Sequence, residues 1–213
     1  MLELMVTSLV LLRHGQSTWN LHGRLQGQTM DVELTELGVQ QARNAAHQLA
    51  ASLPAGTPIF SSDQRRAQQT AEIVAAALAS QIHFDARLRE QDLGEMTGKL
   101  ASELSALPTP TGQHISEIRW GGGESVADVY QRSLEFLAEL PAVPRAIIVG
   151  HGDALRILAA AADGRGHRDV DYDLVLDNAE PLPINWSGAI DSPVGDHAAS
   201  HRLLRMRSDT GLG

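Results

Sequence analysis

Two short stretches of the chain are mostly apolar, with no polar residue at positions 9–12 or 146–149. Residues 6–13 read VTSLVLLR and residues 146–149 read AIIV. Runs of this kind are typical of strands buried on both faces of a parallel sheet. Two shorter runs, residues 58–60 and 82–84, predict further strands, the second of them at a sheet edge.

A helical spacing of apolar positions separates these runs. Apolar residues recur there at intervals of three or four, the pattern of a helix with one buried face. Thr35 and Ser125 are expected as N-caps, and Ser61 with Gln64 has capping-box spacing ahead of the second helix. The predicted helices are residues 35–51, 62–78, 125–140 and 154–162. Strands alternating with helices predict an α/β fold, a three-layer α/β/α sandwich around a mostly parallel sheet.

The least regular part of the chain is residues 87–123. A short helix is expected from about residue 99 to 107, ended by Pro108 and Pro110. Long irregular excursions in compact domains are usually functional, so we expect residues 87–123 to form a lid over a site. Weaker strand patterns occupy residues 173–177, 182–186 and 202–206.

No internal repeat, linker or composition break divides the chain. The expectation is therefore a single domain over residues 1–213, with its core at about 6–186. The tail from about residue 187 to 213 matches no motif.

Charge and composition limit the partners. The chain has 213 residues, with 17 Lys and Arg against 26 Asp and Glu, which gives a formal net charge of −9. An acidic chain without basic runs argues against nucleic acid or an anionic membrane as partner. Any anion that it binds must meet a local cluster of positive charge. The absence of cysteine excludes disulfides, and the N-terminus lacks the pattern of a signal peptide, so a cytoplasmic location is expected.

Two strand ends repeat one pattern, an apolar run followed by histidine and glycine. The first reads Arg13-His14-Gly15 and the second His151-Gly152. A single histidine at a strand end is more often a structural residue. Two in matching positions, with an arginine beside the first, favour a site, because the carboxyl ends of neighbouring parallel strands lie at one edge of a sheet.

A third junction between strand and helix places Arg66 in the first turn of the second helix. Arginine is unfavourable for the helix dipole there, so Arg66 is either a solvated side chain or shares a bound anion with the helix N-terminus. Glu90 supplies a carboxylate where the irregular excursion begins, and an isolated glutamate of this kind is usually solvated.

Taken together, the motifs resemble the histidine phosphatase superfamily, also called the phosphoglycerate mutase-like family. The blocks that carry the resemblance follow one another in order over about residues 6 to 180: Arg13-His14-Gly15, Asn20, Gln26-Gly27, Leu34-Thr35 with Gly38, Ser61-Ser62 with Arg66-Ala67 and Thr70, Leu88-Arg89-Glu90 with Gly94, Gly123-Glu124-Ser125, and His151-Gly152.

The resemblance implies a role for each matching position. His14 is the expected nucleophile that becomes a phosphohistidine, and Glu90 the general acid that protonates the leaving alcohol. The expected cradle for the phosphoryl oxygens is Arg13, Arg66 and His151. The expected substrate contacts are Gly15, Asn20, Gln26 and Gly27. The implied activity is metal-independent hydrolysis of a small phosphorylated metabolite, with no cofactor.

Physical chemistry sets two requirements for these roles. His14 must stay neutral to attack, and two flanking guanidinium groups should lower its pKa. Glu90 must hold a proton near neutral pH, so partial burial should raise its pKa.

Two other functions remain open. A cofactor-dependent phosphoglycerate mutase uses the same chemistry, but members of that branch are longer and carry extra basic residues between the acid and the Gly-Glu-Ser block. Here residues 91–122 contain only Lys99 and Arg119. A non-catalytic phospho-ligand binder on the same fold predicts damage to the motif residues, and none is visible. The sequence names neither the substrate nor the oligomeric state, a homodimer included.

Three further patterns do not support a site. Residues 169–180 have the acidic spacing of a calcium loop but carry Leu174 where that loop needs glycine. His197 and His201 have zinc-pair spacing without a third ligand. Glycines 121–123 lack the Gly-Lys-Ser/Thr ending of a phosphate loop, so we interpret them as the entry to the following helix.

Overall fold

The computed structural model describes residues 7–104 and 109–186. Its five strands form one sheet in the order β3-β2-β4-β1-β5, in which only β5 is antiparallel to its neighbour. The strands are β1 (Thr7–Arg13), β2 (Ile59–Ser61), β3 (Ile82–Phe84), β4 (Arg145–Gly150) and β5 (Pro181–Trp186). The mostly parallel sheet is confirmed. The strand expected at residues 202–206 and the His197–His201 pair lie outside the described residues.

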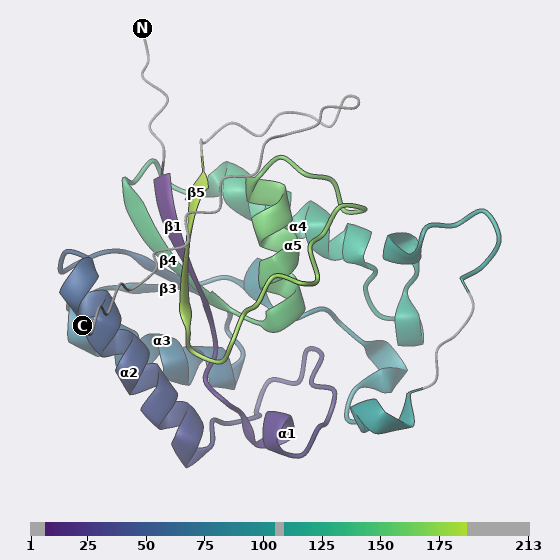
Figure 1. Cartoon of the computed structure of the whole chain (residues 1–213), viewed down its shortest axis with the longest axis horizontal. Helices are drawn as coiled ribbons and strands as arrows, with labels where there is room; N and C mark the ends of the chain where they lie inside the picture. The colour runs from purple at the N-terminus through teal and green to yellow at the C-terminus, as the bar shows by residue number, and fades with distance from the viewer. Residues whose placement is uncertain (1–6, 105–108, 187–213) are drawn as a thin grey trace, which may run out of the picture.

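Helices cover both faces of this sheet (Figure 1). They are α1 (Thr18–Leu21), α2 (Glu36–Ser52), α3 (Arg65–Leu78), α4 (Val126–Glu139) and α5 (Gly152–Ala162). Alternate side chains of β1 serve the two layers: Leu9 and Leu11 pack with α4 and α5, whereas Val10 and Leu12 pack with α2 and α3. Successive side chains of a strand point to opposite faces of the sheet. Because all four of these side chains are buried, both faces of β1 are covered. None of the described helices combines the length and apolarity that a membrane crossing needs.

Capping explains where two of the long helices begin. The Thr35 hydroxyl accepts from the Gly38 N–H at 3.0 Å, and Ser125 forms a capping box with Asp128. The capping box expected at Ser61 is wrong, because α3 begins at Arg65 with Gln64 as its N-cap and no side-chain cap bond. The Gln64 amide is engaged elsewhere, as described below.

Short 3₁₀ turns replace regular structure between β3 and α4. They are η1 (Ala86–Leu88), η2 (Gly94–Met96), η3 (Ala101–Glu103), η4 (Ile115–Glu117) and η5 (Trp120–Gly122). The helix expected at residues 99–107 is wrong, since only η3 is helical in its described part. Residues 101–104 are all exposed, so no buried face stabilises a longer helix there.

This excursion, teal in Figure 1, is attached to the segment that follows α1. Gly98 N–H donates to the Leu25 carbonyl at 2.8 Å, and Leu25 N–H donates to the Lys99 carbonyl at 2.9 Å. The excursion therefore adjoins the loop that contains Gln26 and Gly27.

The strand expected at residues 173–177 is also wrong, because this segment begins in a turn at Asp173 and continues without regular structure through residues 175–177. The Asp171 carboxylate accepts from the Asp173 N–H at 3.0 Å. Local side-chain bonds of this kind compete with strand pairing.

Candidate active site

The carboxyl ends of β1, β2 and β4 meet at one edge of the sheet. Arg13 pairs in register with Gly150, and His14 N–H continues the ladder to the Gly150 carbonyl at 2.9 Å. His14 and His151 thus follow neighbouring parallel strands, and their ring centroids lie 5.2 Å apart. The expectation that both histidines lie at the same edge is confirmed.

Hydrogen bonds hold the His14 ring in one orientation. Its side chain is buried, and its Nδ1 lies 2.7 Å from the carbonyl oxygen of Gly15. A carbonyl can only accept, so Nδ1 carries the proton and the lone pair is on Nε2. The Gly15 N–H donates to the Thr70 hydroxyl at 3.1 Å, and the Asn178 amide donates to the His14 carbonyl at 2.8 Å.

The surroundings of His14 keep the imidazole neutral. Burial is the largest cause that lowers the pKa of His14 well below its ordinary value of 6.5, and Arg66 and then Arg13 lower it further. The predicted direction holds, but the guanidinium groups come second to burial. The pKa of His151 is lowered in the same way, first by burial and then by Arg66.

Three cationic or potentially cationic side chains surround this ring. Arg66 and His151 are fully buried, and Arg13 is partly buried. Across residues 7–104 and 109–186, the buried side-chain nitrogens without a hydrogen-bond partner are Arg13 Nε, Arg66 Nε and His151 Nδ1. The other nitrogen of His151 lies 2.9 Å from the Ser62 hydroxyl. The charges of Arg66 and Arg13 act on both His14 and His151, so these four side chains are neighbours.

Two backbone carbonyls orient the Arg66 guanidinium. Its two terminal nitrogens donate to the Thr29 carbonyl at 2.9 Å and the Gly27 carbonyl at 3.1 Å. Burial lowers the pKa of Arg66 to about 10, so the group remains charged at neutral pH. Gly27 itself has φ +46, in the left-handed region that favours glycine.

The Glu90 carboxyl group lies beside the N-terminus of α5. Its Oε1 accepts from the N–H groups of Gln91 and Ala154, each at 3.0 Å. Burial and then the nearby Asp153 carboxylate raise the pKa of Glu90, against the opposing effect of those two bonds and of Arg66. The predicted direction holds.

The remaining sequence candidates surround Ser17. The Ser17 hydroxyl lies 3.0 Å from the Asn20 amide oxygen and 2.9 Å from the Gln26 amide oxygen. Both amides thereby turn their oxygens toward Ser17. Gly15 packs against Gly38, where an added Cβ would lie 2.3 Å from the Gly38 carbonyl oxygen. Since the Gly15 N–H is bonded to Thr70, Gly15 orients His14 through its backbone.

The sequence did not predict the polar contacts of Arg132 and Glu124 with the backbone around Glu90. The Arg132 guanidinium donates to both oxygens of Glu124 and to the carbonyls of Arg87 and Glu90. The Glu124 carboxylate also accepts from the Asp92 N–H at 2.9 Å. Glu124 was visible in the Gly-Glu-Ser block, but no local signal connected it to Arg132 or to the backbone of Glu90.

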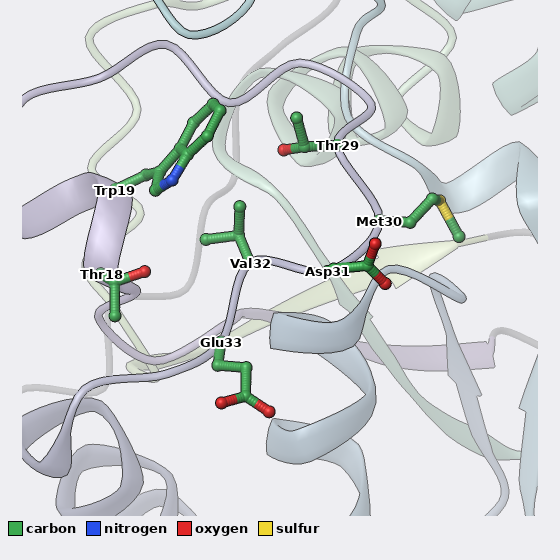
Figure 2. A pocket seen from close by; sticks show the side chains of 7 residues that line it. All are labelled: Thr18, Trp19, Thr29, Met30, Asp31, Val32 and Glu33. Carbon is green, nitrogen blue, oxygen red and sulfur yellow. The ribbon is translucent and has the colours of Figure 1, made fainter.

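A hollow of about 460 Å³ is lined by Thr18, Trp19 and residues 29–33. Figure 2 shows Trp19 of α1 beside residues 29–33, whose side chains line it. Thr29 belongs to both features, since its side chain lines the hollow and its carbonyl accepts from Arg66.

Comparison with known proteins identifies the family. The model of the histidine phosphatase superfamily (branch 1) matches residues 9–188. The chain belongs to this superfamily. It is 37% identical to glucosyl-3-phosphoglycerate phosphatase of Mycolicibacterium vanbaalenii, over 75% of each chain. It is 34% identical to phosphoglycerate mutase-like protein 4 of Arabidopsis thaliana, over 70% of this chain and 68% of that protein.

A solved structure gives the same result for the fold. The mycobacterial glucosyl-3-phosphoglycerate phosphatase in complex with VO3 matches with a TM-score of 0.72 and 33% identity, covering 83% of this chain and 90% of that one. The superfamily and these relatives support a phosphatase or phosphotransferase enzyme. Within the described ranges, no group of three or more His, Asp or Glu side chains is placed to hold a metal ion.

Proposed function

We propose that the protein hydrolyses phosphate monoesters of small metabolites through a phosphohistidine intermediate on His14. One observation carries the proposal: the three buried nitrogens that lack partners in the described part of the chain belong to Arg13, Arg66 and His151, around one neutral imidazole. A phosphoryl group offers oxygen acceptors to such nitrogens, and charge-assisted bonds to its oxygens are strong.

In the first step, the lone pair on His14 Nε2 attacks phosphorus and the bond to the leaving oxygen breaks. Glu90 gives its proton to that oxygen, so the product leaves as a neutral alcohol. Burial and the nearby Asp153 carboxylate raise the pKa of Glu90, which favours the protonated form that this step needs. The bond from His14 Nδ1 to Gly15 keeps Nε2 as the attacking atom.

In the second step, water attacks the phosphohistidine. The Glu90 carboxylate takes a proton from this water, the bond between phosphorus and Nε2 breaks, and inorganic phosphate forms. A covalent intermediate replaces one difficult displacement with two easier ones. Arg13 and Arg66 compensate the charge on the phosphoryl oxygens in both steps, so the mechanism uses no metal ion.

The similarity to a phosphoglycerate mutase-like protein supports a second candidate function, in which the phosphoryl group is transferred back to phosphoglycerate. A mutase must retain the leaving molecule, whose carboxylate needs positive charge from the lid. The lysine and arginine residues of the range 91–122 are Lys99 and Arg119 alone. The Arg119 guanidinium forms an ion pair with Asp128 at 2.7 Å. Such a lid favours transfer to water, and we therefore propose the phosphatase.

The test is release of inorganic phosphate from p-nitrophenyl phosphate and from a panel of metabolite monoesters. We expect turnover by the wild type and none by His14→Ala, with a trapped phosphoenzyme that is acid-labile and absent from the variant. A folded wild-type protein that turns over no monoester but binds phosphate would support the non-catalytic binder. Isomerisation of phosphoglycerate without phosphate release would support the mutase.

A further inference from the structure

Gln64 connects the proposed acid to the loop that holds Arg66. The Gln64 side chain is fully buried at the start of α3. Its amide oxygen accepts from the Glu90 N–H at 2.8 Å. Its amide nitrogen donates to the Gly27 carbonyl at 3.1 Å and to the Thr29 carbonyl at 2.9 Å. Both hydrogens of the amide and one side of its oxygen are thus used.

The same two carbonyls accept from Arg66. Each carbonyl oxygen has two lone pairs, so it can accept from the Gln64 amide and from the guanidinium together. The carbonyls of Gly27 and Thr29 therefore set the position of Arg66 relative to Gln64, and Gln64 sets the position of the Glu90 backbone. No other described side chain is hydrogen-bonded both to these carbonyls and to Glu90.

Residues 29–33 of the same loop line the hollow described above, as Figure 2 shows. Other bonds hold neighbouring positions of the loop, since the Arg65 N–H donates to the Met30 carbonyl at 2.9 Å and the Thr29 hydroxyl donates to the Gln26 carbonyl at 2.8 Å. Within the described part of the chain, the Gly27 and Thr29 carbonyls themselves accept hydrogen bonds from Gln64 and Arg66 alone.

We propose that Gln64 is a positioning residue for phosphoryl transfer, which fixes the distance between the proton donor Glu90 and the phosphate-binding Arg66. The inference rests on the proposed function. Proton transfer to the leaving oxygen depends on this distance, because a misplaced catalytic group loses most of its effect.

Gln64→Leu tests the inference, since it removes all three bonds and leaves a side chain of similar size. We expect kcat/KM for an alkyl phosphate such as glycerol phosphate to fall at least tenfold more than kcat/KM for p-nitrophenyl phosphate, whose leaving group needs no proton. The alkaline limb of the pH profile with the alkyl substrate should also change. Gln69→Leu is the matched control. It removes one hydrogen bond made by a side-chain amide of the same helix, in which the Gln69 oxygen accepts from the Leu34 N–H, and it should affect both substrates equally.

Equal loss on both substrates, or no loss, would overturn the inference even if the wild type is an active phosphatase that depends on His14. Gln64→Met, whose flexible side chain also lacks the amide, replaces Gln64→Leu if the latter does not fold. A wild type without phosphatase activity would instead contradict the proposed function. In that case the affinity for inorganic phosphate, measured by calorimetry, tests the positioning role of Gln64. We expect the Gln64 variant to bind phosphate at least fivefold more weakly than the wild type, and an unchanged affinity would overturn the inference.

Discussion

Burial of two neutral histidines should make the stability of the protein fall as the pH drops below 6.5. The folded-state pKa values of His14 and His151 lie well below their ordinary value of 6.5, with burial as the largest cause. Below pH 6.5 the unfolded chain therefore binds more protons at these positions than the folded chain. The corresponding stability is fully present above pH 6.5 and is lost as the pH falls toward the folded pKa values.

The size of this loss follows from proton linkage. If the folded imidazole stays neutral, lowering the pH from 6.5 to 5.0 reduces the free energy of unfolding by about 1.7 kcal/mol per histidine, or about 3.3 kcal/mol for both. Glu90 acts in the opposite direction, because its raised folded pKa makes the folded state bind more protons than the unfolded state. The total slope mixes both effects, so a comparison of variants is required.

The assay is urea unfolding followed by circular dichroism at pH 6.5, 6.0, 5.5 and 5.0. In His14→Gln the loss of stability over this interval should be smaller than in the wild type by about 1.7 kcal/mol. His47→Gln, at an exposed position on α2, controls for the substitution itself. The reasoning is wrong if His14→Gln and the wild type lose the same free energy of unfolding.

Four further predictions concern activity and packing. Glu90→Gln should lower kcat/KM for an alkyl phosphate by about 10²- to 10⁴-fold and kcat/KM for p-nitrophenyl phosphate far less, and equal lowering of the two kcat/KM values would remove Glu90 from the acid role. Asp153→Asn removes a negative charge that raises the pKa of Glu90, so the alkaline limb of kcat/KM should move to lower pH; an unmoved limb would contradict this. Gly38→Ala places a Cβ 2.0 Å from the Gln16 carbonyl oxygen and should lower stability by about 1–3 kcal/mol in thermal melts, whereas an unchanged Tm would refute the packing argument. Activity should survive EDTA, and its loss would show that a metal ion takes part.

The central part of the fold could be predicted from local pattern alone. The runs at residues 9–12 and 146–149 are apolar at every position, and such runs are stable only between two covering layers. Histidine and glycine directly after each run then predicted that His14 and His151 lie at one edge. The pairing of β1 with β4 confirms this, because the parallel register brings the two strand ends together.

The supporting hydrogen bonds could not be predicted, because they join loops that are distant in sequence. Gln64 is separated by 26 residues from Glu90 and by 37 from Gly27, and no periodicity relates them. The capping box expected at Ser61 is wrong for the same reason, since the Gln64 side chain is bonded to other loops. Burial of His14 likewise depends on how the layers pack, so sequence reasoning assigned its lowered pKa to the arginines first.

The pKa shifts together set the charge of the site for its proposed substrate. The lowered pKa values of His14 and His151 leave Arg13 and Arg66 as the positive charges that act on the imidazole of His14. The raised pKa of Glu90 favours its neutral form, which does not oppose a phosphate monoester of about −1.5 to −2 charge. Protonation of His14 would add positive charge but remove the attacking lone pair, and ionisation of Glu90 would remove both the proton and part of the attraction. Burial, which raises the pKa of the carboxyl group and lowers those of the imidazoles, therefore favours the protonation states that the proposed acid and the proposed nucleophile both need.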